Sequence, residues 1–86
     1  MNDQEILEGI GEVARRHLGF TGELRPGQRL AEDLELDSLK MLTLAVEVEN
    51  RFRICLDPSS EARIATVGDL AAEVGRQLER RSDDAP

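Results

Sequence analysis

The residues best placed to carry chemistry in this sequence are Asp37 and Ser38, which open an apolar-periodic run after a long irregular segment. Asp is a preferred N-cap residue because its carboxylate accepts hydrogen bonds from the unpaired amides of the first helical turn. With Asp37 as the cap, the Ser38 hydroxyl is left to face solvent beside the positive end of the helix macrodipole. Such a place suits a phosphate ester, because helix N-termini bind anions. The alternative is that Ser38 is only a capping or polar surface residue.

Other kinds of chemistry have little support in the sequence. It contains one His and one Cys, neither Tyr nor Trp, and no glycine-rich phosphate loop. No spacing of His, Cys and acids suits a metal ion. The acids are spread over predicted helix faces, so no general acid–base pair is indicated. We therefore expect a protein that binds or carries and not an enzyme. Cys55 has no cysteine to pair with, and we expect it to be a small buried hydrophobic side chain.

Composition and charge limit the classes of partner. The chain of 86 residues is 40% hydrophobic and 34% charged, which predicts one small domain with a mainly aliphatic core. Its net charge of −7 disfavours nucleic acids and anionic membranes and favours basic protein surfaces. No apolar run has the length of a membrane span, and no secretory signal is visible. We expect a cytoplasmic monomer.

The elements that must position Ser38 begin with a helix over residues 2–18, where apolar residues recur at helical spacing. Asn2 and Glu5 form a capping-box pattern at its start. Residues 19–36 have no sustained period and contain Pro26, which predicts a long loop pinned to the core by apolar residues. One helical turn is expected near residues 30–34.

A second helix is predicted from Ser38 to about Phe52, and its broad apolar side, beginning at Leu39, indicates a central element. Residues 53–58 are expected to form an extended connection, followed by one short helix over residues 59–64. Thr66 and Asp69 form a further capping box that opens the last helix. The expected fold is all-α, a small four-helix bundle of three main helices and one short helix with a long first loop. The domain is predicted to span residues 1–81, with a disordered tail over residues 82–86.

This order of elements resembles an acyl carrier protein, a member of the phosphopantetheine-attachment superfamily. Asp-Ser-Leu alone is a weak signal, but its setting among helices of this order and spacing makes the resemblance fairly specific. The residues that carry it are Asp33-Leu34-Glu35-Leu36-Asp37-Ser38-Leu39, then Val48, Phe52, Leu56-Asp57-Pro58, the turn over residues 60–64, and Thr66-Val67.

The resemblance implies a non-catalytic carrier whose Ser38 bears 4′-phosphopantetheine, attached by a separate phosphopantetheinyl transferase. The family's preceding acid corresponds to Asp37. The arm ends in a thiol that holds acyl groups as thioesters for acyl-activating, synthase or acyltransferase enzymes. Carriers of this kind serve fatty acid, polyketide or other specialised acyl metabolism.

Two departures from the family pattern bear on the subtype. Glu35 stands where a Gly is common, and the exposed stripe of the second helix is less acidic than in many fatty acid carriers, which favours a dedicated pathway. A peptidyl or aryl carrier of a nonribosomal synthetase system and a helical interaction module without a prosthetic group are the alternatives. The residues expected to dock partners are Leu39, Lys40, Thr43, Glu47, Asn50 and Arg51.

The aliphatic core also permits a shelter for an acyl chain. A seam between the second helix and the short helix after it would open to admit the chain. Ordinary close packing of the same residues is the alternative. The seam is expected to be lined by Leu42, Val46, Leu56 and Ile64.

Overall fold

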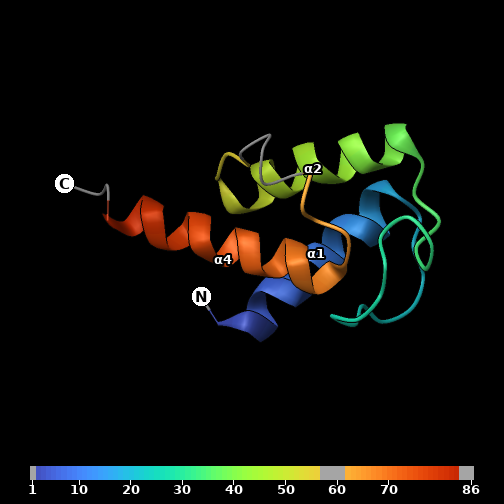
Figure 1. Cartoon of the computed structure of the whole chain (residues 1–86), viewed down its shortest axis with the longest axis horizontal. Helices are drawn as coiled ribbons and strands as arrows, with labels where there is room; N and C mark the ends of the chain where they lie inside the picture. Colours follow the sequence, from blue (N-terminus) through green and yellow to red (C-terminus); the bar gives the residue numbers. More distant parts are fainter. Residues whose placement is uncertain (1, 57–61, 84–86) are drawn as a thin grey trace.

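This computed structural model describes residues 2–56 and 62–83, which contain three helices (Figure 1). They are α1 (Asp3–His17), α2 (Ser38–Phe52) and α4 (Val67–Asp83). Both α2 and α4 pack against α1. The predicted all-α fold is confirmed. Residues 59–61 of the predicted short helix lie outside the described residues, and residues 62–63 form a turn.

The first helix begins and ends as its sequence predicts. The Glu5 amide donates to the Asn2 side-chain oxygen at 2.8 Å, so Asn2 is the N-cap. The helix ends at His17, and Gly19 then takes a φ of 68°, a left-handed conformation that favours glycine. Its buried face carries aliphatic residues that contact the other two helices, and Gly9 lies directly against the Phe52 ring at the end of α2.

The long first loop, residues 18–37 and here named loop 1, is held in two ways. Leu30, Leu34 and Leu36 are buried in the core, as predicted for a pinned loop. Its residues 29–34 form the expected turn, in which the Asp33 amide donates to the Arg29 carbonyl at 2.8 Å. These contacts fix the path of the chain into α2.

Loop 1 is also joined to the start of α4 by backbone hydrogen bonds. The Leu30 amide donates to the Ala65 carbonyl at 3.0 Å. In the other direction, the amides of Val67 and Gly68 each donate to a loop 1 carbonyl, those of residues 28 and 26, at 2.9 Å. The first amides of α4, which have no partner within their own helix, are thereby satisfied by loop 1.

The capping box predicted before α4 is confirmed. The Asp69 amide donates to the Thr66 hydroxyl oxygen at 3.0 Å, and the Asp69 carboxylate accepts the amides of Ala65 at 3.0 Å and Thr66 at 3.1 Å. The Ala65 amide, followed by that of Thr66, lowers the pKa of Asp69 below its usual value because both favour the ionised form. The helix continues through Asp83, and the rest of the predicted tail, residues 84–86, lies outside the described residues.

The burial of Cys55 and of Glu73 differs from what the sequence indicates. Cys55 is exposed, because successive side chains of an extended segment point to opposite sides and the larger neighbours Ile54 and Leu56 take the core side. Glu73 of α4 is only 2% exposed, although the acids were expected on solvated faces. Its carboxylate accepts hydrogen bonds from Arg76 and from Gln77, one turn further along the helix, which offset the cost of burying a charge.

None of the helices in the described ranges is long and apolar enough to cross a membrane. Within the same ranges, no three or more His, Cys, Asp or Glu side chains gather where they would hold a metal ion.

Candidate functional site

The start of α2 presents a serine hydroxyl to solvent. Asp37 is the N-cap, with its Oδ1 accepting the Lys40 amide at 2.8 Å and its carbonyl accepting the Met41 amide at 2.8 Å. Ser38 is the first residue of the helix and is exposed. Because Asp37 performs the capping, the Ser38 side chain is not needed for it. This is the arrangement that the sequence predicts.

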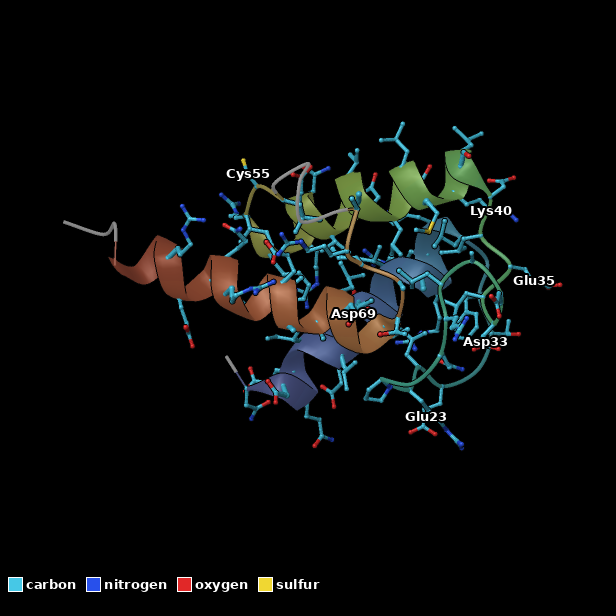
Figure 2. All side chains as sticks on the ribbon, viewed as in Figure 1. Glu23, Asp33, Glu35, Lys40, Cys55 and Asp69 are labelled. Atoms are coloured by element: carbon cyan, nitrogen blue, oxygen red, sulfur yellow. The ribbon has the colours of Figure 1, made fainter. Side chains whose placement is uncertain are left out.

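The surroundings of Ser38 fit a phosphodiester. The first turn of α2 contains no acid, so no carboxylate within the helix opposes a negative charge there. The carboxylate of the adjacent Asp37 is already hydrogen-bonded to the Lys40 amide. The positive end of the helix dipole and the exposed Lys40 side chain both favour an anion at this end of the helix (Figure 2).

The chain just before the cap projects one acid into solvent. Leu34 and Leu36 are buried, and Glu35 between them is exposed with a φ of 55° (Figure 2). A side chain in this left-handed conformation costs about 1–2 kcal/mol, which a glycine at the position would avoid. The Glu35 side chain is therefore held outward at the edge of the site, in spite of a local backbone cost.

The faces of α2 differ from the sequence-based prediction. The core side is formed by Leu44, Val48 and Phe52, which are buried. Leu39, Leu42 and Val46, which the helical periodicity places on the apolar side, are exposed by 72%, 61% and 42%. Leu39 is also one of the residues expected to dock partners. Apolar residues occupy most of the circumference of this helix, so periodicity alone does not indicate which of them its neighbours cover. We name these three exposed residues the apolar face of α2.

The predicted polar docking stripe is divided between two surroundings. Glu47 and Arg51 lie toward α1, where Glu47 is 3.4 Å from His17 and Arg51 is 3.5 Å from Glu12. The Thr43 hydroxyl donates to the Leu39 carbonyl one turn earlier, at 3.0 Å. Lys40 and Asn50 are exposed.

An apolar cavity of about 250 Å³ lies beside α2. It brings together Leu42, Leu56 and Ile64 of the predicted seam, whereas Val46 is not among its lining residues. Met41, Leu42 and Ala45 line it from α2 and follow Ser38 by three, four and seven residues, so they share its side of the helix. The helical spacing from Ser38 could have identified these residues in the sequence. The lining that the sequence analysis missed is Leu30, Met41, Leu44, Ala45 and Leu70.

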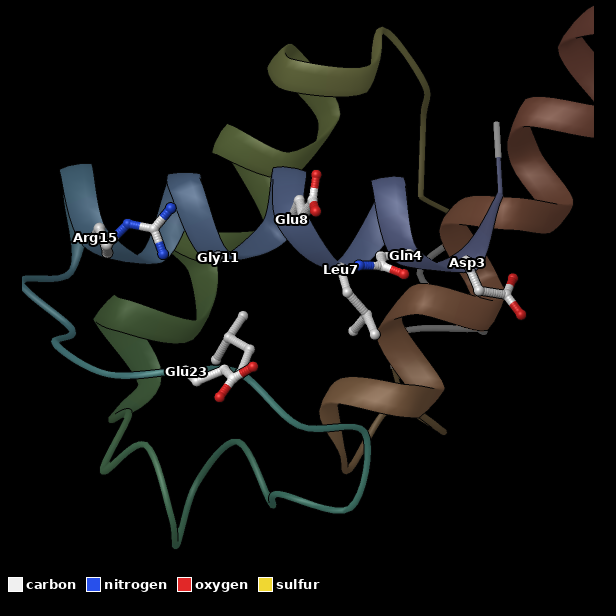
Figure 3. A pocket seen from close by; sticks show the side chains of 8 residues that line it. Asp3, Gln4, Leu7, Glu8, Gly11, Arg15 and Glu23 are labelled. Carbon is white, nitrogen blue, oxygen red and sulfur yellow. The ribbon is translucent and has the colours of Figure 1, made fainter.

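A second hollow, between the outer side of α1 and loop 1, has a different character (Figure 3). Half of its lining residues are charged, with Asp3, Glu8 and Glu23 as acids and Arg15 as the base. None of its lining residues comes from α2. It is therefore separate from the surface around Ser38.

Known proteins resemble this chain over most of its length. The family model described as "Phosphopantetheine attachment site" matches residues 8–74, which include all of α2. The meromycolate extension acyl carrier protein of Mycolicibacterium aurum is 31% identical over 85 residues, covering 98% of this chain and 87% of that protein. An acyl carrier protein of Kineococcus radiotolerans is 30% identical over 76 residues, covering 87% of this chain and 94% of that protein.

The fold has a counterpart among solved structures. A protein described as an acyl carrier protein from Mycobacterium tuberculosis superposes with a TM-score of 0.77 and is 32% identical. The match covers 83% of this chain and 96% of that one.

Proposed function

The chain belongs to the acyl carrier proteins of the phosphopantetheine-attachment family, and on that premise we propose that Ser38 is the residue that bears its 4′-phosphopantetheine. The observation that carries this proposal is the exposure of Ser38 at the first position of α2 while Asp37 alone provides the cap. A hydroxyl so placed is accessible to a modifying enzyme, and a phosphodiester formed on it stays in water beside the helix dipole.

The bound group supplies a flexible arm with a terminal thiol, on which acyl groups are held as thioesters. The chain itself provides a place of attachment and surfaces for partners, and members of this carrier family are generally non-catalytic. Asp37 fixes the start of the helix, and Lys40 adds a positive charge beside the phosphodiester. Attachment requires a separate phosphopantetheinyl transferase.

We propose that the apolar cavity beside α2 shelters part of the acyl chain. Its lining is almost wholly aliphatic and includes Leu42, Leu56 and Ile64. Ser38 shares a side of α2 with Leu42, so an arm attached there starts on the side of the helix that lines the cavity. Val46, the fourth residue of the predicted seam, is 42% exposed and is assigned to the partner surface instead.

The partner surface is proposed to be the outward side of α2. The apolar face offers contact area, and Lys40, Thr43 and Asn50 border it. Glu47 and Arg51 have a mixed role, because their contacts with α1 hold the two helices together. The partners are acyl-activating, synthase or acyltransferase enzymes of fatty acid, polyketide or related acyl metabolism, and the relatives named for meromycolate extension support the fatty acyl branch.

A mass measurement tests the attachment residue. The purified chain is incubated with coenzyme A, magnesium and a broad-specificity phosphopantetheinyl transferase, and its intact mass is determined. The wild-type chain should gain one phosphopantetheine, and Ser38→Ala should gain none. Thr21→Ala is the control and should gain the same mass as wild type, since Thr21 also has an exposed hydroxyl but lies outside the proposed partner surface. A wild-type chain that gains no mass, or a Ser38→Ala chain that still gains it, contradicts the proposal.

A further inference from the structure

Among the four acids of residues 32–37, the last part of loop 1 before Ser38, Glu35 stands apart. Glu32 pairs with the Arg29 guanidinium at 3.2 Å, Asp33 accepts the Arg29 amide at 2.7 Å, and Asp37 caps α2. The Glu35 carboxylate has no hydrogen bond or ion pair within the part of the chain that the structure describes. It is therefore the acid of this segment left for a partner.

The fold holds this carboxylate outward. Its neighbours Leu34 and Leu36 are anchored in the core, which fixes the backbone on both sides. With a φ of 55°, Glu35 points away from the body of the protein, at the end of α2 where Ser38 lies (Figure 2). The backbone that carries the charge is thus already held in place, so it loses little conformational freedom when a partner binds.

The carboxylates of α2 do not take this role. Glu47 lies 3.4 Å from His17, and the Glu49 Oε2 accepts the Leu56 amide at 2.7 Å. Leu39, in the first turn, is 72% exposed. The surface around Ser38 therefore combines an apolar residue on the helix with a negative charge on the loop that precedes it.

An enzyme that modifies the Ser38 hydroxyl must lie over it and so must cover the exposed residues beside it. Resting on the proposed attachment at Ser38, we propose that the phosphopantetheinyl transferase recognises this carrier by setting a basic side chain against the Glu35 carboxylate and an apolar surface over Leu39. Charge complementarity at the rim of an interface mainly speeds association. Glu35 is accordingly a specificity residue that acts on encounter and leaves the chemical step unchanged.

The chemical step is the same for every variant of Glu35. The Ser38 oxygen forms a bond to the phosphorus of the pantetheine phosphate of coenzyme A, and the diphosphate bond at that phosphorus breaks. The hydroxyl proton passes to a base of the transferase, and adenosine 3′,5′-bisphosphate leaves. No oxidant or reductant is consumed. A change at Glu35 should therefore appear in KM and not in kcat.

The experiment uses a transferase that modifies the wild-type chain, with steady-state kinetics followed by intact mass. Glu35→Gln should raise KM for the carrier roughly two- to fivefold with kcat unchanged, and Glu35→Lys should raise KM further. Added salt should raise the KM of the wild-type chain more than that of Glu35→Gln. Salt screens the attraction between the Glu35 carboxylate and the transferase, which the variant lacks. Glu23→Gln, an exposed acid of loop 1 well apart from Glu35 in Figure 2, removes the same charge and should leave KM unchanged.

Glu35→Gly separates charge from backbone, since glycine accepts the same φ without strain, and it should behave as Glu35→Gln does. An unchanged KM in Glu35→Gln overturns the inference, as does an equal rise in Glu23→Gln or a wild-type KM in Glu35→Gly. If the wild-type chain is modified at Ser38 while Glu35→Gln is unaffected, only this inference fails. If the wild-type chain gains no mass, the proposed attachment fails with it.

Discussion

Replacing Gly9 by alanine tests how closely α1 and α2 approach. An ideal Cβ at Gly9 would lie 2.5 Å from Cζ of Phe52 and 3.1 Å from Cε1, well inside normal contact. Phe52 is the last residue of α2 and is 4% exposed, so its ring cannot simply turn into solvent. At Gly11, two residues further along the same helix, the nearest atoms are a flexible Arg15 nitrogen at 3.4 Å and Leu24 Cδ1 at 3.7 Å.

Two effects of opposite sign compete in these variants. Alanine in a helix interior is favoured over glycine by about 1 kcal/mol. Inserting a methyl group into a tightly packed core costs about 1–3 kcal/mol. At Gly11 only the first effect operates, so Gly11→Ala should be more stable than wild type by up to about 1 kcal/mol. At Gly9 the overlap with Phe52 outweighs it, so Gly9→Ala should be less stable by up to about 2 kcal/mol.

The two variants can be compared by urea unfolding followed by far-UV circular dichroism, because the chain has neither Trp nor Tyr to report by fluorescence. With an m-value of about 1 kcal/mol/M, the midpoint of Gly9→Ala should lie roughly 1–3 M below that of Gly11→Ala. In thermal unfolding, each 1 kcal/mol should shift Tm by about 4–8 °C in a domain of this size.

A Gly9→Ala chain as stable as Gly11→Ala would refute the reasoning. It would mean that the Phe52 ring moves aside at little cost and that the packing of α1 on α2 is looser than the distances indicate. The m-values of the two variants should agree with that of wild type, since a changed slope would report a change in the unfolded or native ensemble instead.

Two further predictions concern the acyl cavity and the capping box. When the arm is loaded with octanoyl instead of acetyl, the methyl chemical shifts of Leu42, Leu56 and Ile64 should change in NMR spectra. Those of Val46, which lies outside the lining, should change less. Identical spectra for the two loaded forms would exclude shelter in the cavity. The lowered pKa of Asp69 means that folding favours its ionised form. Its contribution to stability is therefore fully present above pH 3.8, the ordinary pKa of the group, and is lost as the pH falls through the lower pKa of the folded chain. In urea unfolding from neutral to acidic pH, Asp69→Asn should be less stable than wild type at neutral pH. The difference in the free energy of unfolding should narrow on acidification, and a constant difference would contradict a lowered pKa for Asp69.

Helix positions and caps were predictable because they depend on local signals. Asn2, Asp37 and the Thr66–Asp69 pair are short-range patterns in which a side chain satisfies an amide within four residues. The same locality made Ser38 identifiable as the first residue of α2. No tertiary information was required for either.

Burial was harder to predict because it depends on which other elements pack against each side of a helix. Leu39, Leu42 and Val46 are apolar, as core residues usually are, but they are exposed because α1 packs against another side of α2. Glu73 is charged, as surface residues usually are, but it is buried, and hydrogen bonds from Arg76 and Gln77 satisfy its carboxylate. The backbone pairing of loop 1 with α4 joins segments far apart in sequence and leaves no periodic signal.

That pairing has a consequence for how the chain folds. It connects residues 26–30 with residues 65–68, so it closes a large loop of chain that contains the whole of α2. Closing so long a loop has an entropic cost that nearby contacts must offset, and the cost grows only slowly with its length. Loop 1 is therefore a structural member of the fold as much as a connection. Deleting the loop 1 residues that pair with α4 would remove the carbonyls that accept its first amides, so the C-terminal helix depends on a segment about forty residues before it.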